Sequence, residues 1–137
     1  MARRGATVGR TNDADALWTA HEPAAHAPIA VFICVMQFVA VFAYKVDEGS
    51  AAAFEAAYGP SGEWARFFGQ GKGYIGTELW RPAAESPGRY LVIDRWRSAS
   101  AYESFLVEHE AAYRRRSEEA ERLYRAESVV GRFAADP

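Results

Sequence analysis

The chain has 137 residues, of which 50% are hydrophobic and 14% aromatic, enough for one domain with a substantial core. Its 16 basic and 18 acidic residues give a formal net charge of -2, so no overall positive field attracts nucleic acid, and we expect no nucleic-acid partner. The single cysteine, Cys34, cannot form an internal disulfide, which is typical of a protein of the reducing cytoplasm.

Residues 1–35 differ in character from the rest of the chain. They begin with scattered Arg, Ala, Thr and Gly without apolar periodicity, and we expect an extension that is largely unstructured. The run from Pro28 to Tyr44 is almost continuously apolar and could be mistaken for a signal anchor. Because its second half continues directly into the first strand of the main domain, we expect no membrane-spanning segment. Met36 precedes that strand, which suggests a folded unit over residues 36–137.

Two runs are predicted to be buried strands. Residues 38–44 (Phe-Val-Ala-Val-Phe-Ala-Tyr) and 90–93 (Tyr-Leu-Val-Ile) are apolar at odd and even positions alike. A strand with one solvated face would instead alternate apolar and polar side chains. Each of these strands therefore needs a covering layer on both sides.

The elements are predicted in the order strand, helix, strand, strand, helix, strand. A short helix over residues 51–58 is followed by a helical segment with one apolar face, formed by Trp64, Phe67 and Phe68. Strands over residues 74–80 and 89–96 form a hairpin, and the last strand covers residues 128–133. Between them, Ser100 and Glu103 have the spacing of a capping box at the start of a long helix. The apolar stripe of that helix consists of Tyr102, Phe105, Leu106, His109 and Tyr113.

This βαββαβ order predicts a ferredoxin-like antiparallel sheet of the α+β class, with the first and third strands in the centre. Helices can cover one face of such a sheet. A chain of this length has no further element for the other face, and a second copy packed sheet against sheet would cover it. We therefore expect a homodimer that forms through the sheet face.

Four segments resemble the antibiotic biosynthesis monooxygenase domain family. They are Phe-Val-Ala-Val-Phe at 38–42, Tyr-Gly-Pro-Ser-Gly-Glu-Trp at 58–64, Gly-Tyr-Ile-Gly-Thr-Glu-Leu at 73–79 and Arg-Tyr-Leu-Val-Ile-Asp-Arg-Trp at 89–96. The resemblance spans residues 36–133 and implies a dimeric α+β barrel. The family includes cofactor-independent oxygenases of quinols and aromatic polyketides, haem-degrading monooxygenases and proteins without an assigned activity, so the fold alone does not decide the chemistry.

The haem-degrading members are similar to one another in an Asn on the first strand, a Trp on the long helix and a His iron ligand late in that helix. Here the first strand has no Asn, the Trp position is Phe105, and the ligand position is nearest to Arg115. His109 lies about one and a half helical turns earlier. We therefore expect no metal and no cofactor, and haem binding by His109 in a shifted pose is a third possibility.

Cofactor-independent oxygenation requires an aromatic substrate that is held in an apolar pocket, deprotonated so that its anion can reduce dioxygen, and shielded from water. We expect His109, Asp94 and Arg95 to be catalytic, with His109 as the base because histidine titrates near neutral pH. Asp94 and Arg95 are adjacent in one strand and point to opposite faces, and the sequence does not decide which faces the helices. The expected substrate-binding residues are Tyr44, Trp64, Tyr74, Trp96 and Tyr102, and for Trp64 and Trp96 the sequence favours a position in the core over one in the pocket wall.

The sequence thus predicts a small cofactor-independent monooxygenase-like protein that oxidises a planar aromatic or quinol substrate with O2. The alternative is a non-catalytic ligand-binding or accessory domain of the same fold. A cavity beneath the second long helix, lined by His109 and tyrosines, would indicate the enzyme. A space filled by Phe and Trp side chains would indicate the alternative.

Overall fold

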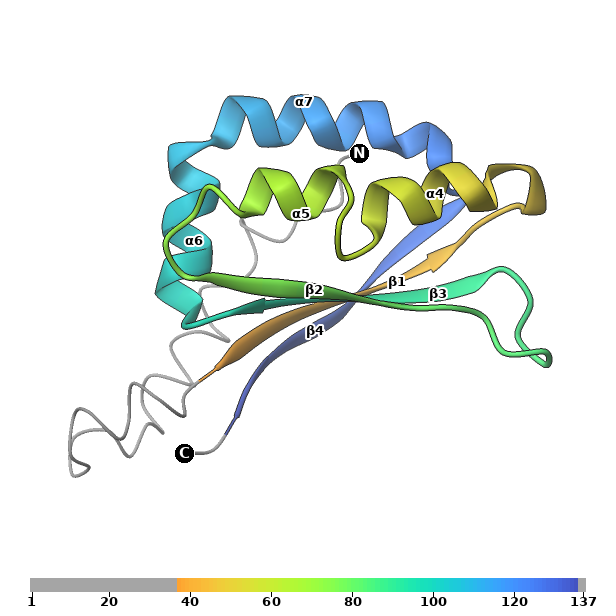
Figure 1. Ribbon diagram of the computed structural model, residues 1–137, viewed down its shortest axis with the longest axis horizontal. Coiled ribbons are helices and arrows are strands. Elements are labelled where there is room, and N and C mark those ends of the chain that lie inside the picture. Colours follow the sequence, from red (N-terminus) through yellow and green to blue (C-terminus); the bar gives the residue numbers. More distant parts are fainter. Residues whose placement is uncertain (1–36, 136–137) are drawn as a thin grey trace.

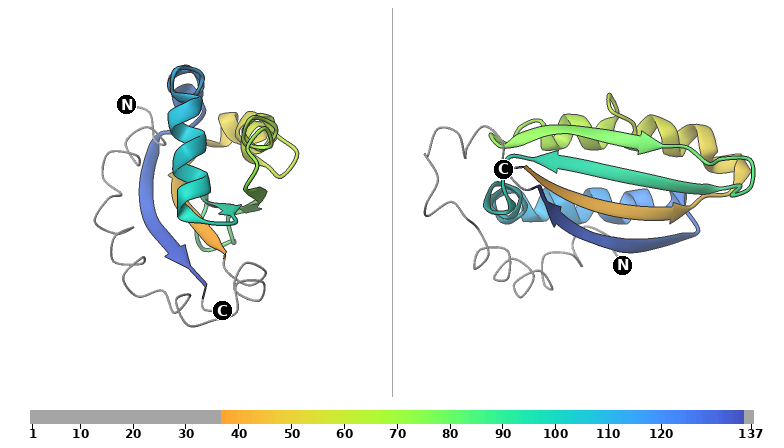
Figure 2. Two further views of the ribbon diagram at one scale, coloured as in Figure 1. Left: turned by 90° about the vertical axis from the view of Figure 1, so that its left-hand side faces the viewer. Right: turned by 90° about the horizontal axis from the view of Figure 1, so that it is seen from below.

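A computed structural model describes residues 37–135 as a four-stranded antiparallel sheet with helices on one face (Figures 1 and 2). The expected extension, Met36 and Cys34 lie outside the described residues. The strands are β1 (Phe38–Lys45), β2 (Tyr74–Trp80), β3 (Arg89–Trp96) and β4 (Ala126–Ala134), in the sheet order β2-β3-β1-β4. The first and third strands are central, which confirms the ferredoxin-like α+β prediction.

The helices follow the predicted order along the chain. They are α4 (Ala51–Tyr58), α5 (Glu63–Phe68), α6 (Ala99–Glu108) and α7 (Glu110–Ala120), with 3-10 turns at Glu48–Ser50 and Glu121–Leu123. Gly59 ends α4 and Gly62 precedes α5, so the Gly-Pro-Ser-Gly segment separates the two helices as expected. In the described part of the chain no helix is long and apolar enough to cross a membrane.

The long helix predicted after the β2–β3 hairpin differs from the structure at its start and in its middle. Ser98, rather than Ser100, caps α6, because its Oγ accepts a hydrogen bond of 3.1 Å from the backbone N–H of Ala101. At His109 the backbone leaves the helical region (φ -115, ψ 30), and α7 runs at a steep angle to α6 (Figure 1). The predicted stripe is therefore divided between two helices, with His109 at their junction.

The two faces of the sheet differ in what covers them. Even-numbered side chains of β1 and β3, such as Phe42 and Val92, point toward the helices and are fully buried. Odd-numbered side chains, such as Val39 and Ile93, lie half-buried on the opposite face, here called the outer face. The helices α4 to α7 all lie on the side of the sheet away from that face (Figure 2).

Candidate functional site

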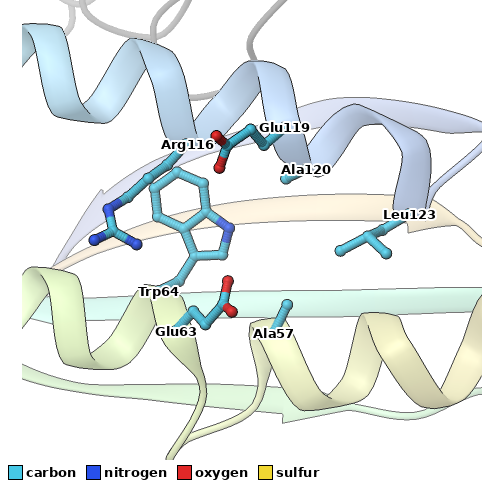
Figure 3. A pocket seen from close by; sticks show the side chains of 7 residues that line it. All are labelled: Ala57, Glu63, Trp64, Arg116, Glu119, Ala120 and Leu123. Atoms are coloured by element: carbon cyan, nitrogen blue, oxygen red, sulfur yellow. The ribbon is translucent and has the colours of Figure 1, made fainter.

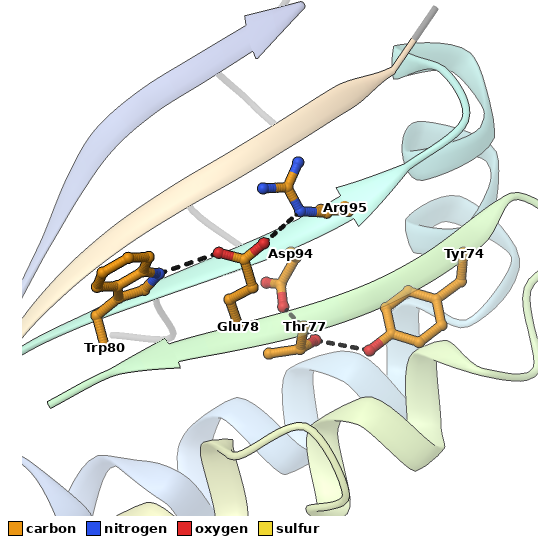
Figure 4. Close-up of polar contacts among 6 residues, drawn as sticks. All are labelled: Tyr74, Thr77, Glu78, Trp80, Asp94 and Arg95. Carbon is orange, nitrogen blue, oxygen red and sulfur yellow. Dashed lines mark hydrogen bonds and ion pairs between the residues drawn. The ribbon is translucent and has the colours of Figure 1, made fainter. Parts of the chain in front are cut away.

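Asp94 is a carboxylate at the centre of the helix-covered face, and its residue is 0% exposed. Its Oδ1 accepts a hydrogen bond of 2.8 Å from Thr77 Oγ1, and Thr77 Oγ1 lies 2.6 Å from the hydroxyl of Tyr74 (Figure 4). β2 supplies Tyr74 and Thr77, and β3 supplies Asp94. The three side chains form one hydrogen-bonded chain, here called the relay.

The direction of the relay follows from the number of its protons. Thr77 has one hydroxyl proton, and an ionised carboxylate can only accept hydrogen bonds. When Thr77 donates to Asp94, its oxygen must therefore accept from the Tyr74 hydroxyl. Thr77 and Asp94 are buried, whereas Tyr74 is half-buried. In this arrangement each hydroxyl donates toward Asp94, and the half-buried Tyr74 forms the outer end of the chain.

Trp96 follows Asp94 on the same face of β3 and is 0% exposed. Its ring centroid lies 5.3 Å from Tyr74 and 5.6 Å from Tyr102, so the structure brings these three predicted residues together. The Trp96 indole N–H has no hydrogen-bond partner among the described residues. A buried N–H without a partner costs about 1–3 kcal/mol.

The loop between α5 and β2 closes one end of this cluster. A side chain carbon at Gly71 would lie 2.8 Å from Phe105 Cδ1 and 3.0 Å from Trp96 Cζ3. A side chain carbon at Gly73 would overlap the Cβ of Ala101 on α6. Glycine at these two positions lets the backbone lie directly against the aromatic rings, so the loop covers the Trp96 side of the relay.

His109 lies apart from the relay. Its ring stacks on Phe105 at 4.1 Å and meets the edge of Phe67 at 5.9 Å. Its Nδ1 is 3.1 Å from the Phe105 carbonyl oxygen, which can only accept, so Nδ1 donates in this bond. Phe105 lies between His109 and Trp96, with its ring centroid 4.1 Å from the first and 5.5 Å from the second.

Arg95 lies on the outer face, opposite to Asp94. Its Nε donates a hydrogen bond of 2.6 Å to Glu78, whose other carboxylate oxygen accepts one of 3.0 Å from the Trp80 indole N–H (Figure 4). These hydrogen bonds, first that from Arg95, lower the pKa of Glu78 below its usual range. The structure therefore separates the predicted catalytic residues Asp94 and Arg95 by the thickness of the sheet.

Tyr44 and Trp64 lie toward the other end of the core. Tyr44 packs on Tyr58 at 5.1 Å, and Tyr58 packs on Trp64 at 6.1 Å. Trp64 borders a cavity of about 30 Å³ between α5 and α7, which has room for about one or two water molecules (Figure 3). Its lining consists of Ala57, Glu63, Trp64, Arg116, Glu119, Ala120 and Leu123. This cavity is too small for an aromatic substrate.

The space beneath α6 is filled by aromatic side chains. Phe68 and Phe105 lie 5.6 and 5.5 Å from Trp96, and Phe67 lies 5.1 Å from Phe105. Larger hollows, of about 490 and 420 Å³, open at the surface away from the relay. The first, at the end of the sheet, includes Tyr44 in its lining.

Thr77 is the member of the relay that sequence reasoning missed. It stands opposite Asp94 in the β2–β3 hairpin. The hairpin itself was predicted, but the pairing shifts between Tyr74 and Gly76, so simple alternation along β2 does not give this register. The Gly-Thr-Glu sequence in a strand facing Asp94 was the available signal.

The combination of an antiparallel ferredoxin-like sheet and one helix-covered face defines an α+β protein. A profile of the antibiotic biosynthesis monooxygenase family matches residues 37–112, which is more than half of the 137 residues. The chain belongs to this family. A search among curated proteins gave no match.

Several solved structures share the fold at low identity. A single-residue variant of SnoaB, a cofactor-independent oxygenase from Streptomyces nogalater, is 18% identical with a TM-score of 0.54, over 74% of this chain and 92% of that one. MhuD, a heme-degrader from Mycobacterium tuberculosis, is 21% identical with a TM-score of 0.51, over 72% and 94%. A conserved protein from Methanosarcina mazei is 8% identical with a TM-score of 0.51, over 77% and 97%. These likenesses concern the fold.

Proposed function

We propose that this protein is a cofactor-independent oxygenase that oxidises a planar phenol, quinol or anthrone with O2, with the relay as its base. The observation that carries the proposal is the hydrogen-bonded chain from Tyr74 through Thr77 to the fully buried Asp94. A chain of hydroxyl groups that ends on a buried carboxylate is a candidate path for a proton. The family and the likeness to SnoaB support the same activity.

The relay would remove one proton from the substrate. The substrate hydroxyl donates to the Tyr74 oxygen, Tyr74 passes its own proton to Thr77, and Thr77 passes its proton to Asp94. The net change is a substrate anion and a neutral Asp94. The Trp96 N–H, which lies in the ring cluster beside Tyr74, would then be available to donate to an anionic oxygen.

The oxidation balances without an external reductant. The substrate anion gives one electron to O2, and the resulting radical pair combines to a peroxide at the ring carbon. In the hydroxyl form of the substrate this carbon carries one hydrogen, and loss of water from it leaves a carbonyl, so that the C–OH group, this C–H and one O2 give two C=O groups and one H2O. The proton held on Asp94 returns to the departing oxygen as water forms. The aromatic surroundings would keep bulk water from the intermediates.

A second candidate function is non-catalytic binding of a ligand or partner, and one observation favours it. The space beneath α6 is filled by Phe67, Phe68, Trp96 and Phe105 rather than left open beside His109. The oxygenase therefore requires the loop that contains Gly71 and Gly73 to move away from Trp96 when substrate enters. The accessory function requires no such movement.

We also propose that the working form is a homodimer through the outer face. The central strands place the half-buried Val39 and Ile93 there, and Phe133 on the neighbouring edge strand is 46% exposed. An apolar sheet face of this kind usually meets another layer. A cytoplasmic location is proposed from the sequence alone, because the chain has one cysteine.

Oxygen uptake by the purified protein tests the oxygenase. With a panel of naphthoquinols and anthrones, we expect uptake above the uncatalysed rate, reduced by about 100-fold or more in Tyr74→Phe, because the first acceptor of the proton is lost. Tyr124→Phe is the matched control, since Tyr124 packs on Tyr44 and lies outside the relay. No uptake with any substrate, together with calorimetric binding of the same compounds, would establish the binding function instead.

A further inference from the structure

Tyr74 and Trp96 are adjacent in the ring cluster, and their side chains lose an electron more easily than the phenylalanines around them. The two ring centroids are 5.3 Å apart in an edge-to-face arrangement. Trp96 is 0% exposed, whereas Tyr74 is half-buried. An electron therefore has a short distance to travel from Tyr74 to an oxidised Trp96, and Tyr74 is the more exposed of the pair.

The surroundings of Trp96 disfavour the charge that oxidation would place on it. Its indole N–H has no hydrogen-bond partner among the described residues, so oxidised Trp96 has no acceptor there for its proton and remains a radical cation. Phe68 and Phe105 lie 5.6 and 5.5 Å from its ring. A buried charge in apolar surroundings is costly. An electron from a neighbour that can also release a proton would remove this charge.

The hydroxyl group of Tyr74 has the proton acceptor that Trp96 lacks. Its oxygen is 2.6 Å from Thr77 Oγ1, and Thr77 donates a hydrogen bond of 2.8 Å to Asp94 (Figure 4). Loss of one electron makes a phenol strongly acidic, so its proton leaves when an acceptor is in hydrogen-bond contact. The relay can receive this proton without a large movement of any side chain.

Other tyrosines have one of these two features. The Tyr90 hydroxyl donates a hydrogen bond of 2.5 Å to Glu55, but the ring on which Tyr90 packs is that of Phe54, 4.9 Å away. Tyr102 contacts Trp96 at 5.6 Å and is not a member of the relay. Tyr74 combines the tryptophan contact with the path for the proton.

We infer that Tyr74 is a redox-active tyrosine, which removes oxidising equivalents from Trp96 and so protects the ring cluster from damage. A one-electron oxidant, such as a peroxyl radical, takes an electron from Trp96, and Tyr74 replaces that electron. The Tyr74 proton moves to Thr77 as the Thr77 proton moves to Asp94. The products are the reduced oxidant, neutral Trp96, a neutral tyrosyl radical and neutral Asp94. A thiol or ascorbate then returns one electron to Tyr74, and the proton comes back from Asp94.

This role goes beyond the proposed oxygenase, because it needs neither the substrate nor O2. An oxygenation reaction is one source of peroxyl radicals, and radicals from the surrounding solution are another. The inference depends on the positions of Trp96, Tyr74 and the relay, and it can be tested in the protein alone.

Photo-oxidation of the full chain, without substrate and under argon, tests the inference. The oxidant is a ruthenium(III) tris-bipyridyl complex, generated by a light flash from the ruthenium(II) complex with a cobalt(III) ammine as electron acceptor. Electron paramagnetic resonance of the frozen sample detects the radical, and ring-deuterated tyrosine identifies it as tyrosyl. We expect a tyrosyl signal from the unaltered chain.

We expect Tyr74→Phe to lose most of this signal. Thr77→Val should lose it as well, because the phenolic proton then has no path to Asp94, whereas Thr77→Ser keeps the hydroxyl group and should keep the signal. Trp96→Phe should lower the signal, since the neighbour that passes the oxidation to Tyr74 is absent. Unchanged melting temperatures would show that the variants are folded.

Tyr102→Phe and Tyr124→Phe are the matched controls. Tyr102 contacts the same tryptophan, and Tyr124 is half-buried like Tyr74, so neither substitution should reduce the signal. The inference is overturned if the unaltered chain gives no tyrosyl radical, if the signal survives in Tyr74→Phe, or if the Val and Ser variants of Thr77 give equal signals. Because the sample holds no substrate or O2, this failure would leave the proposed oxygenase standing, and absence of oxygen uptake would likewise leave the role of Tyr74 intact.

Discussion

Thr77 and Asp94 face each other across β2 and β3, and the 2.8 Å hydrogen bond between them fixes the direction of the whole relay. Thr77 has a single proton to donate, and giving it to Asp94 obliges its oxygen to accept from Tyr74, 2.6 Å away. Removal of this one hydroxyl group therefore interrupts the relay while both of its ends remain in place.

Thr77→Val is the sharpest test of that role, because valine keeps the shape of threonine and lacks the hydroxyl group. We expect a loss of stability of about 1–3 kcal/mol, since a buried carboxylate oxygen loses its donor. We also expect oxygen uptake to fall to the uncatalysed rate. Thr77→Ser, which keeps the hydroxyl group, should retain uptake. Urea unfolding and oxygen consumption measure the two effects, and equal activity of the Val and Ser variants would remove the relay from the mechanism.

Gly73 and Gly76 form a matched pair for testing how tightly the covering loop packs. A Cβ at Gly73 would overlap the Cβ of Ala101, whereas a Cβ at Gly76 would have nothing within 4 Å. We expect Gly73→Ala to lower the free energy of unfolding by about 1–3 kcal/mol through overpacking, and Gly76→Ala to change it by less than about 0.5 kcal/mol. Denaturant titration of the two variants checks this. Similar stabilities would mean that the loop yields readily and does not seal Trp96.

The fold could be predicted because the apolar patterns along the chain agree with the burial of the strands and helices in the folded protein. The doubly apolar runs became the central strands, and α4 covers Ala51–Tyr58 as expected. The break at His109 was missed because the stripe from Tyr102 to Tyr113 keeps helical spacing and no Gly or Pro interrupts it. Tyr102 of α6 packs on Trp96 of the sheet, whereas Tyr113 of α7 packs on Trp64 of α5, so the two halves of the stripe have different neighbours and this packing overrides the local periodicity.

The candidate site was predicted in part, for a geometric reason. Adjacent residues of a strand point to opposite faces, so the sequence predicted that Asp94 and Arg95 lie on opposite faces of the sheet. Which of the two faces the helices depends on the register of β3 with β1 and β2. Thr77 belongs to the candidate site because it pairs with Asp94, and this pairing depends on the register shift between Tyr74 and Gly76 in β2. The position of His109 depends on where the helix breaks. Cross-strand register and helix ends are the features that single-sequence patterns fix least well.

Ile93 offers a direct test of the proposed homodimer. It lies half-buried in the middle of the outer face, opposite Val41. We expect Ile93→Lys to dissociate the dimer, because a lysine ammonium would have to be buried between two apolar faces. Val107→Lys is the control, since Val107 on α6 is 68% exposed and lies away from this face. Light scattering coupled to size exclusion should show a dimer for the unaltered chain and for Val107→Lys and a monomer for Ile93→Lys. A monomeric unaltered chain would refute the dimer.

Tyr90 predicts a specific dependence of stability on alkaline pH. Burial, with a further contribution from its 2.5 Å hydrogen bond to Glu55, raises the pKa of Tyr90 to about 12. In the unfolded chain a tyrosine has a pKa of about 10. Below that pH Tyr90 is protonated in both the folded and the unfolded chain, so its contribution to stability does not change with pH. Between about pH 10 and 12 the unfolded state loses its proton first, which stabilises it relative to the folded state.

The contribution of Tyr90 to stability should therefore be complete below about pH 10 and be lost as the pH rises through its folded pKa. Tyr90→Phe lacks the phenol, so it isolates this effect from the other tyrosines. We expect the variant to be less stable than the unaltered chain by about 0.5–1.5 kcal/mol near neutral pH, through the lost hydrogen bond, and the difference to shrink steadily above about pH 10. Urea unfolding at a series of pH values measures this difference. A difference that stayed constant through the alkaline range would mean that the Tyr90 phenol ionises alike in the folded and unfolded chains, so that Glu55 and burial do not hold its proton.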